Sequence, residues 1–277
     1  MEATLTVRGA VFCGHREGDV AWVKLCPGLH GIRGRHRGAR QHDSTYPGSW
    51  EACALDEDGF KRLLGAVSET RFSPFLEACN GDLVRAWRLH AWDAEISRAF
   101  LGTMRHFEIT LRHCLQGRLV ALYGRADWWH VPGVVLHATG VKQIRNAESA
   151  VIARNIMPNF EGVVEKLPLG FWVGLIGKGV NYETQFWRPA LRYAFPGYWG
   201  KRVELHRQLN YLRFFRNNIA HQEQIFNRHL EADFRSVCRV IRYMSPEAAA
   251  YAEQHSQVPR VLARKARVLS GEEPSRL

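Results

Sequence analysis

The sequence predicts an all-α protein in which residues 67–270 of a 277-residue chain form a helical bundle. From about residue 71 onward, apolar residues recur at steps of three and four, the spacing that places them on one face of a helix. Gly and Pro residues interrupt this pattern at intervals that suit loops between neighbouring helices. No apolar run reaches the roughly 20 residues that a membrane-spanning helix requires.

The composition restricts the classes of function. The formal net charge is +11 and the isoelectric point is near 9.7, which favours a polyanionic partner such as RNA. Most basic residues are arginines, a bias that arises from phosphate binding or from a GC-rich genome. The six cysteines lack the spacing of a disulfide framework, and no secretory signal is visible. We therefore expect a cytoplasmic protein with reduced thiols and no membrane association.

Residues 1–66 differ from the rest of the chain. They are rich in Gly and Arg and carry no sustained periodicity, so we expect a poorly structured arm. A second interpretation stays open, in which translation begins at Val67. The spacing of four cysteines and histidines in the arm does not fit a zinc knuckle, and we predict no metal site there; these residues are Cys13, His15, Cys26 and His30.

The first predicted helix covers residues 81–95 and continues, or restarts, to about residue 123. Its core stripe consists of Ile96, Phe100, Met104, Phe107, Leu111 and Leu115. Gly and Pro residues mark a loop at 124–133. A second amphipathic helix is expected at 139–155, with Thr139 as its N-cap.

Shorter elements follow. The apolar residues 169–176 predict a short buried helix, and residues 184–195 predict another that Pro189 interrupts. Residues 201–226 have the pattern of a long helix, and residues 229–244 that of the next.

Prolines mark the last two helices. Pro246 and Pro259 suit the first turn of a helix, where their missing N–H groups cost nothing. Residues 271–277 are expected to fray as a tail.

The segment 213–223, with the sequence RFFRNNIAHQE, is the stretch most suited to chemistry. On a helical wheel the apolar stripe is formed by Leu205, Leu209, Leu212, Phe215 and Ile219. Arg216 falls about 40° from Leu212, inside the stripe, and Glu223 falls nearer its centre. Asn217 and His221 lie roughly 140° and 180° away, so the wheel predicts an inward arginine and an outward histidine.

An inward arginine needs a carboxylate partner, because burial of an unpaired charge is costly. Glu108 lies at the edge of the stripe of the first predicted helix, and Arg112 follows it at i+4. We therefore expect Glu108 and Arg216 to face each other across two packed helices. An ordinary structural ion pair beside a surface histidine is the alternative.

Three polar residues share the outward face at a spacing of four: Arg213, Asn217 and His221. An imidazole can accept the 2′-proton of RNA or protonate the leaving oxygen, and a guanidinium can stabilise charge on phosphorus. One histidine supplies half of an acid–base pair, so a second copy in a homodimer would complete it.

The segment Arg216–His221 resembles the R-N-x-x-x-H signature of HEPN domains, and its context resembles the Abi-like (abortive infection) branch of that superfamily. Residues from about 71 to 244 carry the resemblance. Further matching segments are Phe107–Arg112, similar to an E-x-x-x-R helix; Gly124–Trp129, a glycine followed by paired tryptophans; and the aromatic segments Phe171–Leu175 and Phe186–Pro189.

The resemblance implies a HEPN-like bundle with additional helices that forms a homodimer. It also implies a metal-independent endoribonuclease without a cofactor, which cleaves RNA by 2′-hydroxyl attack and leaves a cyclic phosphate. Such proteins act as toxins or in phage defence, and an antidote protein is a possible further partner.

By position, the resemblance implies that Arg216 and His221 are catalytic. The supporting residues are Asn217, Glu108, Arg112, Arg213 and Glu223. The sequence departs from the family pattern at His113, where Asn is usual, and at Gln222, where a second His is common. Two alternatives stay open: a non-catalytic RNA-binding or dimerisation module, and a purely structural bundle.

Overall fold

The computed structural model describes residues 57–153 and 160–276, and within these ranges every regular element is helical. The predicted all-α class is therefore confirmed for this part of the chain. The candidate zinc residues of the arm, Cys13, His15, Cys26 and His30, lie outside the described residues. In the described ranges no helix is long and apolar enough to cross a membrane.

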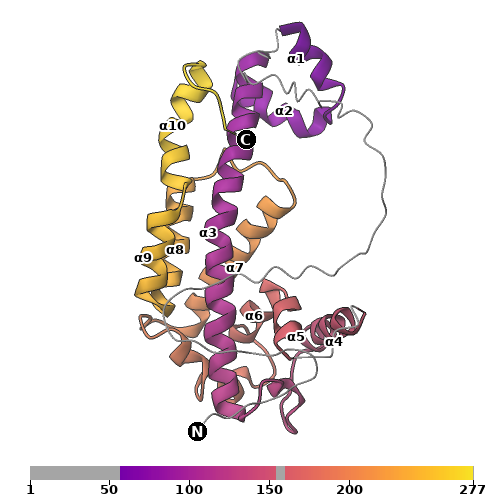
Figure 1. The fold of residues 1–277 in the computed structure, drawn as a ribbon, viewed down its shortest axis with the longest axis vertical. Helices are drawn as coiled ribbons and strands as arrows, with labels where there is room; N and C mark the ends of the chain where they lie inside the picture. The colour runs from indigo at the N-terminus through magenta and orange to yellow at the C-terminus, as the bar shows by residue number, and fades with distance from the viewer. Residues whose placement is uncertain (1–56, 154–159, 277) are drawn as a thin grey trace, which may run out of the picture. The chain divides into compact units, whose positions relative to one another are not determined.

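Helix α3, from Leu83 to Tyr123, is the central element (Figure 1). Asp82 caps its N-terminus by accepting a hydrogen bond from the Arg85 amide at 2.9 Å. Gly124 ends it in the left-handed conformation with φ of 74°. Of the two alternatives left open for residues 81–123, a continuous helix or a restart, the structure has the continuous helix, and its apolar stripe is buried against neighbouring helices.

Two helices near the start of the described part were not expected. Helix α1 (Glu57–Leu64) lies inside the predicted arm, and α2 (Glu69–Ala78) precedes the first predicted helix. Phe72 is fully buried, and its ring centroid lies 4.2 Å from that of Trp87 on α3. Both helices are short, so their stability depends on packing against α3 rather than on a periodic pattern of their own.

Helices α4 (Ala138–Ile152), α5 (Phe160–Lys166) and α6 (Leu169–Ile176) follow. The prediction for α6 is confirmed, whereas the predicted end of α4 at residue 155 lies three positions too late. The predicted N-cap of α4 is also wrong: His137, not Thr139, holds that position, and its Nδ1 accepts from the Thr139 amide at 3.3 Å.

The 184–195 region forms two short turns on either side of Pro189 rather than one helix. Residues Glu183–Trp187 form a π-turn, η2, and Leu191–Ala194 form a 3₁₀ turn, η3. The break follows the expectation that proline interrupts the segment.

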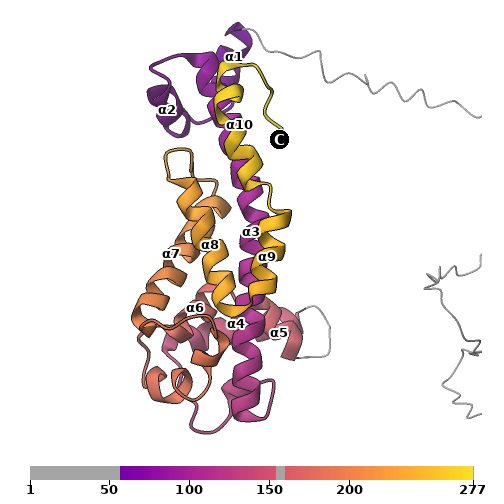
Figure 2. The same cartoon turned by 90° about the vertical axis from the view of Figure 1, so that its left-hand side faces the viewer.

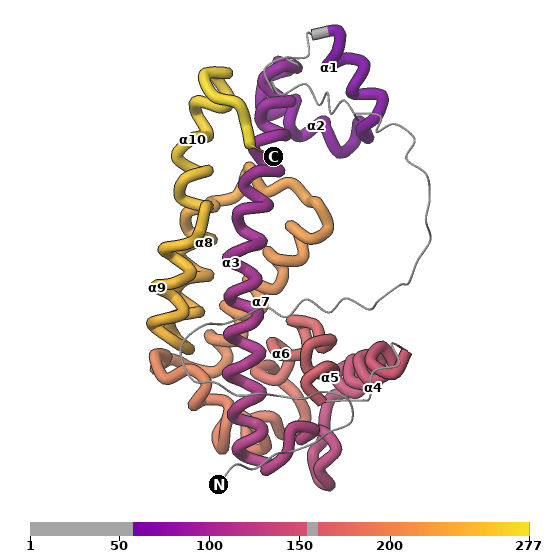
Figure 3. Tube along the Cα trace, viewed as in Figure 1, coloured from indigo at the N-terminus to yellow at the C-terminus, as the bar shows by residue number. Residues whose placement is uncertain are grey.

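The C-terminal part contains α7 (Arg202–Ala220), α8 (Leu230–Met244), α9 (Pro246–His255) and α10 (Val258–Ser270). Figures 2 and 3 show α9 and α10 end to end alongside α3. Pro246 and Pro259 lie in the first turns of α9 and α10, as predicted.

The expected fraying of the tail is contradicted for residues 271–276. The Arg264 guanidinium donates to the Pro274 carbonyl at 2.7 Å, and the Arg276 amide donates to Glu95 at 2.9 Å. The tail is held because buried charged groups of α3 and α10 need these partners.

Candidate functional site

Glu108 on α3 and Arg216 on α7 face each other, as expected, but Arg216 is not buried as its position in the apolar stripe of the wheel predicted. The Arg216 Nε lies 3.6 Å from Glu108 Oε2, and Arg112 Nη2 donates to Glu108 Oε1 at 3.1 Å. The Arg216 side chain is 38% exposed and the Glu108 side chain 16% exposed. One carboxylate thus holds two guanidinium groups while Arg216 stays accessible to a ligand.

A groove of about 360 Å³ runs beside this cluster between α3 and α7. Arg105, a residue that the sequence analysis missed, lines it together with Glu108, Arg112 and Arg216. Arg105 is three residues before Glu108, one helical turn away, so its spacing was a usable signal. Three arginines against one glutamate leave the groove net positive, which favours an anion such as phosphate.

The C-terminus of α7 differs from the prediction. The helix ends at Ala220, not near residue 226, and His221 is its C-cap. The Gln222 amide donates to the Ile219 carbonyl at 3.0 Å, and the Glu223 amide donates to the Asn218 carbonyl at 2.9 Å. These bonds form a Schellman motif, with Gln222 at φ of 59° in the left-handed position that glycine usually occupies.

This early ending overturns the wheel positions beyond residue 220. Glu223 is exposed rather than central in the apolar stripe. His221 is exposed as predicted, but its location follows from the cap and not from a continuing helix. A wheel carries no signal of a left-handed glutamine, so the sequence pattern could not mark this end.

His221 stands apart from Arg216 within one chain. Five residues of helix separate them by about 7.5 Å along the axis and about 140° around it. In the described part of the chain, the His221 imidazole makes no hydrogen bond or ring contact.

The loop that follows His221 is fixed by groups from neighbouring helices. Asp93 of α3 accepts a hydrogen bond from the Ile225 amide at 2.9 Å. Burial raises the pKa of Asp93 to about 6, despite its backbone hydrogen bonds and nearby Lys265. Arg228 pairs with Asp233 of α8 at 2.9 Å. Asp93 was detectable as an acidic residue among the apolar positions of the first helix.

Arg213 belongs to a different surface. It lies against Gly170 of α6 and donates to Asn210 at 2.9 Å. It lines a pocket of about 480 Å³ between α4, α6 and α7, and none of the described residues that line this pocket is acidic. Burial lowers the pKa of His206 in this pocket, and Arg202 and Arg213 lower it further.

The predicted column of Arg213, Asn217 and His221 is therefore not one continuous site in a single chain. The structure brings together Glu108, Arg112 and Arg216, and it directs Arg213 towards α6. His113, one of the departures from the family pattern, lines a separate hollow near η3.

Within residues 57–153 and 160–276, no group of three or more His, Cys, Asp or Glu side chains is arranged to hold a metal ion. Comparison of the chain with protein families, with characterised proteins and with solved structures gives no match.

Proposed function

We propose that the protein is a metal-independent endoribonuclease of the Abi-like HEPN type, acting as a homodimer in phage defence or as a toxin. The observation that carries the proposal is the accessible Arg216, held by Glu108 in a net-positive groove. His221 follows five residues later at the end of the same helix. The +11 net charge is consistent with an RNA substrate.

The proposed reaction is transesterification of RNA. A ribose 2′-oxygen attacks the adjacent phosphorus, the bond from phosphorus to the 5′-oxygen breaks, and a 2′,3′-cyclic phosphate forms. His221 accepts the 2′-proton, or it donates a proton to the leaving 5′-oxygen. Arg216 stabilises the negative charge that develops on the phosphoryl oxygens, and Glu108 fixes its guanidinium.

A homodimer would supply the second imidazole that this reaction needs. Leu101 and Ile109 line the groove beside Arg216 and are 43% and 48% exposed. These exposed apolar side chains suit a contact between two copies of the chain across the groove. We expect Leu101→Asp to convert a dimer into a monomer in light scattering and to abolish cleavage; a wild-type monomer would contradict this step.

The direct test compares RNA cleavage by the wild type and its variants. We expect His221→Ala to slow cleavage by about a hundredfold or more, and Arg216→Ala to have an effect of similar size, with helical circular dichroism unchanged. His229→Ala, at an exposed histidine just before α8, is the matched control and should retain activity. Cleavage should also persist in EDTA. Full activity of His221→Ala would overturn the assignment of the site.

One observation favours a second candidate, a non-catalytic RNA-binding module. The His221 imidazole has no orienting partner in the described part of the chain, whereas catalytic imidazoles are usually oriented by a third group. This candidate predicts salt-sensitive RNA binding without cleavage products and no effect of His221→Ala on binding.

A further inference from the structure

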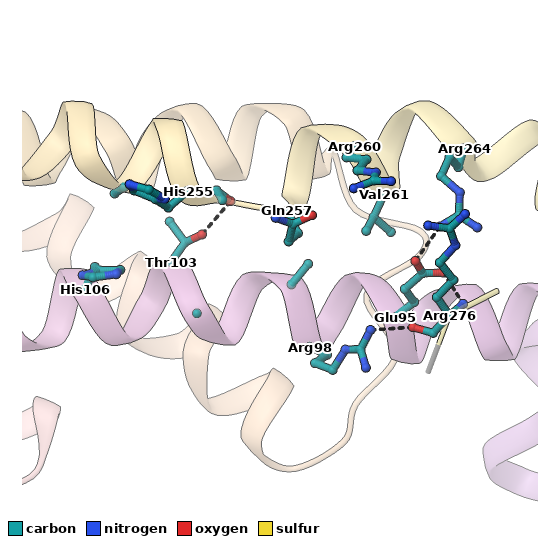
Figure 4. Close-up of a pocket in the computed structure, with 14 residues that line it drawn as sticks. Glu95, Arg98, Thr103, His106, His255, Gln257, Arg260, Val261, Arg264 and Arg276 are labelled. Atoms are coloured by element: carbon teal, nitrogen blue, oxygen red, sulfur yellow. Dashed lines mark hydrogen bonds and ion pairs between the residues drawn. The ribbon is translucent and has the colours of Figure 1, made fainter.

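A second cationic pocket lies between α3 and the α9–α10 pair, on residues that the proposed ribonuclease site does not use. Its volume is about 420 Å³, in the range of small-molecule sites. Figure 4 shows Thr103 and His106 of α3 on one side and His255, Gln257 and Arg260 on the other. Gly102 also lines the pocket, and a Cβ atom added there would meet nothing within 4 Å, so there is unfilled space beside this residue.

The lining of this pocket is strongly positive. Four arginines line it: Arg98, Arg260, Arg264 and Arg276. Its one carboxylate, Glu95, is fully engaged, since Oε1 accepts from Arg264 at 2.6 Å and Oε2 accepts from the Arg276 amide at 2.9 Å. Among the described residues that line the pocket, no other carboxylate is available to neutralise the remaining arginines.

Several polar groups that line the pocket have hydrogen-bond donors or acceptors without a partner among the described residues. The side chains of Arg260 and Gln257 make no hydrogen bond or ion pair within the described residues. The rings of His106 and His255 pack on Tyr251, with centroids 5.1 and 4.3 Å from it, and their nitrogens have no protein partner in that part of the chain. Donors and acceptors of mixed type suit a ligand that carries hydroxyl groups as well as charge.

The start of α10 adds to the positive field. Gln257 is the N-cap of this 13-residue helix, and Ser256, Gln257 and Arg260 all line the pocket. In the first turn of α10 the Val258 amide donates to Ser256 Oγ at 3.2 Å, the Val261 amide donates to the Gln257 carbonyl at 3.0 Å, and Pro259 has no N–H. The turn therefore offers the Arg260 N–H to a phosphate. Helix terminus, arginine side chains and cavity thus coincide at one place.

We propose that this pocket binds a sugar phosphate, either free or as part of a mononucleotide. Arg260 holds the phosphate group through its guanidinium and its backbone N–H. Gln257, His106 and His255 hydrogen-bond the sugar hydroxyls. The pocket lies on other residues than Arg216 and His221, so this binding does not depend on the proposed ribonuclease activity.

The test measures binding to the full-length protein by calorimetry and by thermal shift. The probes are ribose 5-phosphate, AMP, adenosine and inorganic phosphate. We expect ribose 5-phosphate to bind and adenosine not to bind. AMP that binds as ribose 5-phosphate does, or more tightly, identifies a mononucleotide as the source; AMP that fails to bind identifies a free sugar phosphate.

Arg260→Gln should weaken the binding of ribose 5-phosphate by about tenfold or more, since it removes a charge-assisted hydrogen bond. The matched control is Arg145→Gln, at an exposed arginine of α4 that lines none of the pockets described here. It should leave the affinity within about twofold. Gln257→Ala should weaken ribose 5-phosphate more than inorganic phosphate.

Three outcomes would overturn the proposal. The first is no binding of ribose 5-phosphate at millimolar concentration, and the second is equal binding by wild type and Arg260→Gln. The third is binding of inorganic phosphate as tight as that of ribose 5-phosphate, which would indicate an adventitious anion site. None of these outcomes bears on RNA cleavage by His221, which is measured separately.

Discussion

Helix α3 carries two glutamates that each pair with an arginine from a later helix, and the two pairs differ in depth. Glu95 and Arg264 lie 2.6 Å apart with side chains 3% and 7% exposed. Glu108 and Arg216 lie 3.6 Å apart with side chains 16% and 38% exposed. Arg264 also bonds Glu273 and Pro274, whereas Glu108 also bonds Arg112.

The difference separates a structural pair from an accessible one. A buried pair whose remaining donors are all satisfied has little capacity left for a ligand, and removal of one partner leaves an uncompensated buried charge. A loose, half-exposed pair adds little to stability but leaves a guanidinium that a phosphate can reach. The two glutamate–arginine pairs of α3 therefore differ in what they can do: the buried pair stabilises the fold, and the exposed pair leaves an arginine that a ligand can reach.

The largest stability effect is expected for Glu95→Ala. Loss of this carboxylate leaves Arg264 buried with Glu273 as its remaining carboxylate partner among the described residues and releases the Arg276 amide, so we expect a loss on the order of 3 kcal/mol in the free energy of unfolding. Urea denaturation measures it. Glu108→Ala is the matched control and should cost well under half as much; equal costs would remove the distinction between the pairs.

Asp93, the third carboxylate of α3, has no ion pair with any described residue, and its burial should make the stability of the protein depend on pH. Its pKa in the folded protein is about 6, above the ordinary 3.8. Between pH 3.8 and about 6, the Asp93 carboxyl is protonated in the folded state and ionised in the unfolded state. The stabilising contribution of protonated Asp93 is therefore fully present below about pH 4. It is lost as the pH rises through 6, which lowers the free energy of unfolding by about 3 kcal/mol.

Asp93→Asn tests this effect, because the amide cannot ionise but its oxygen can still accept from Ile225. The unfolding free energy of this variant, relative to wild type, should rise as pH increases from 4 to 7. A difference that stays constant over this range would contradict the expected titration.

Arg216→Ala should cost at most about 1 kcal/mol in stability, as exposed ion pairs do. Its effect on RNA cleavage should nevertheless be large. Thermal unfolding and a cleavage assay on the same preparation separate the two. A stability loss as large as that of Glu95→Ala would make Arg216 a structural residue instead.

The smallest effect is expected at the end of α7. Gln222→Gly should stabilise the protein by about 0.5 kcal/mol, since glycine adopts the left-handed conformation without strain. Gln222→Val, whose branched side chain disfavours that conformation, should destabilise it. If neither substitution changes the unfolding free energy, the Schellman motif does not fix the position of His221 in solution.

The periodicity of apolar residues was sufficient to predict a structural feature when that feature depends on a single helix. The core stripe predicted the helix that became α3, and the cost of an unpaired inward charge led to the expected pairing of Arg216 with Glu108. The same periodicity did not predict the conformation of segments that are held by contacts with residues far away in the sequence. Helices α1 and α2 depend on packing against α3, and the tail at 271–276 is held by Glu95, far away in sequence.

The sequence by itself determined the helical class and the apolar stripes, because these depend on spacing along a helix, and it indicated that Arg216 needs a carboxylate partner. The tertiary structure alone decided where α7 stops, that Arg213 turns towards α6, and that α10 closes a cationic pocket over α3. Those outcomes depend on a left-handed residue and on contacts between segments remote in the chain, and a periodic pattern contains neither.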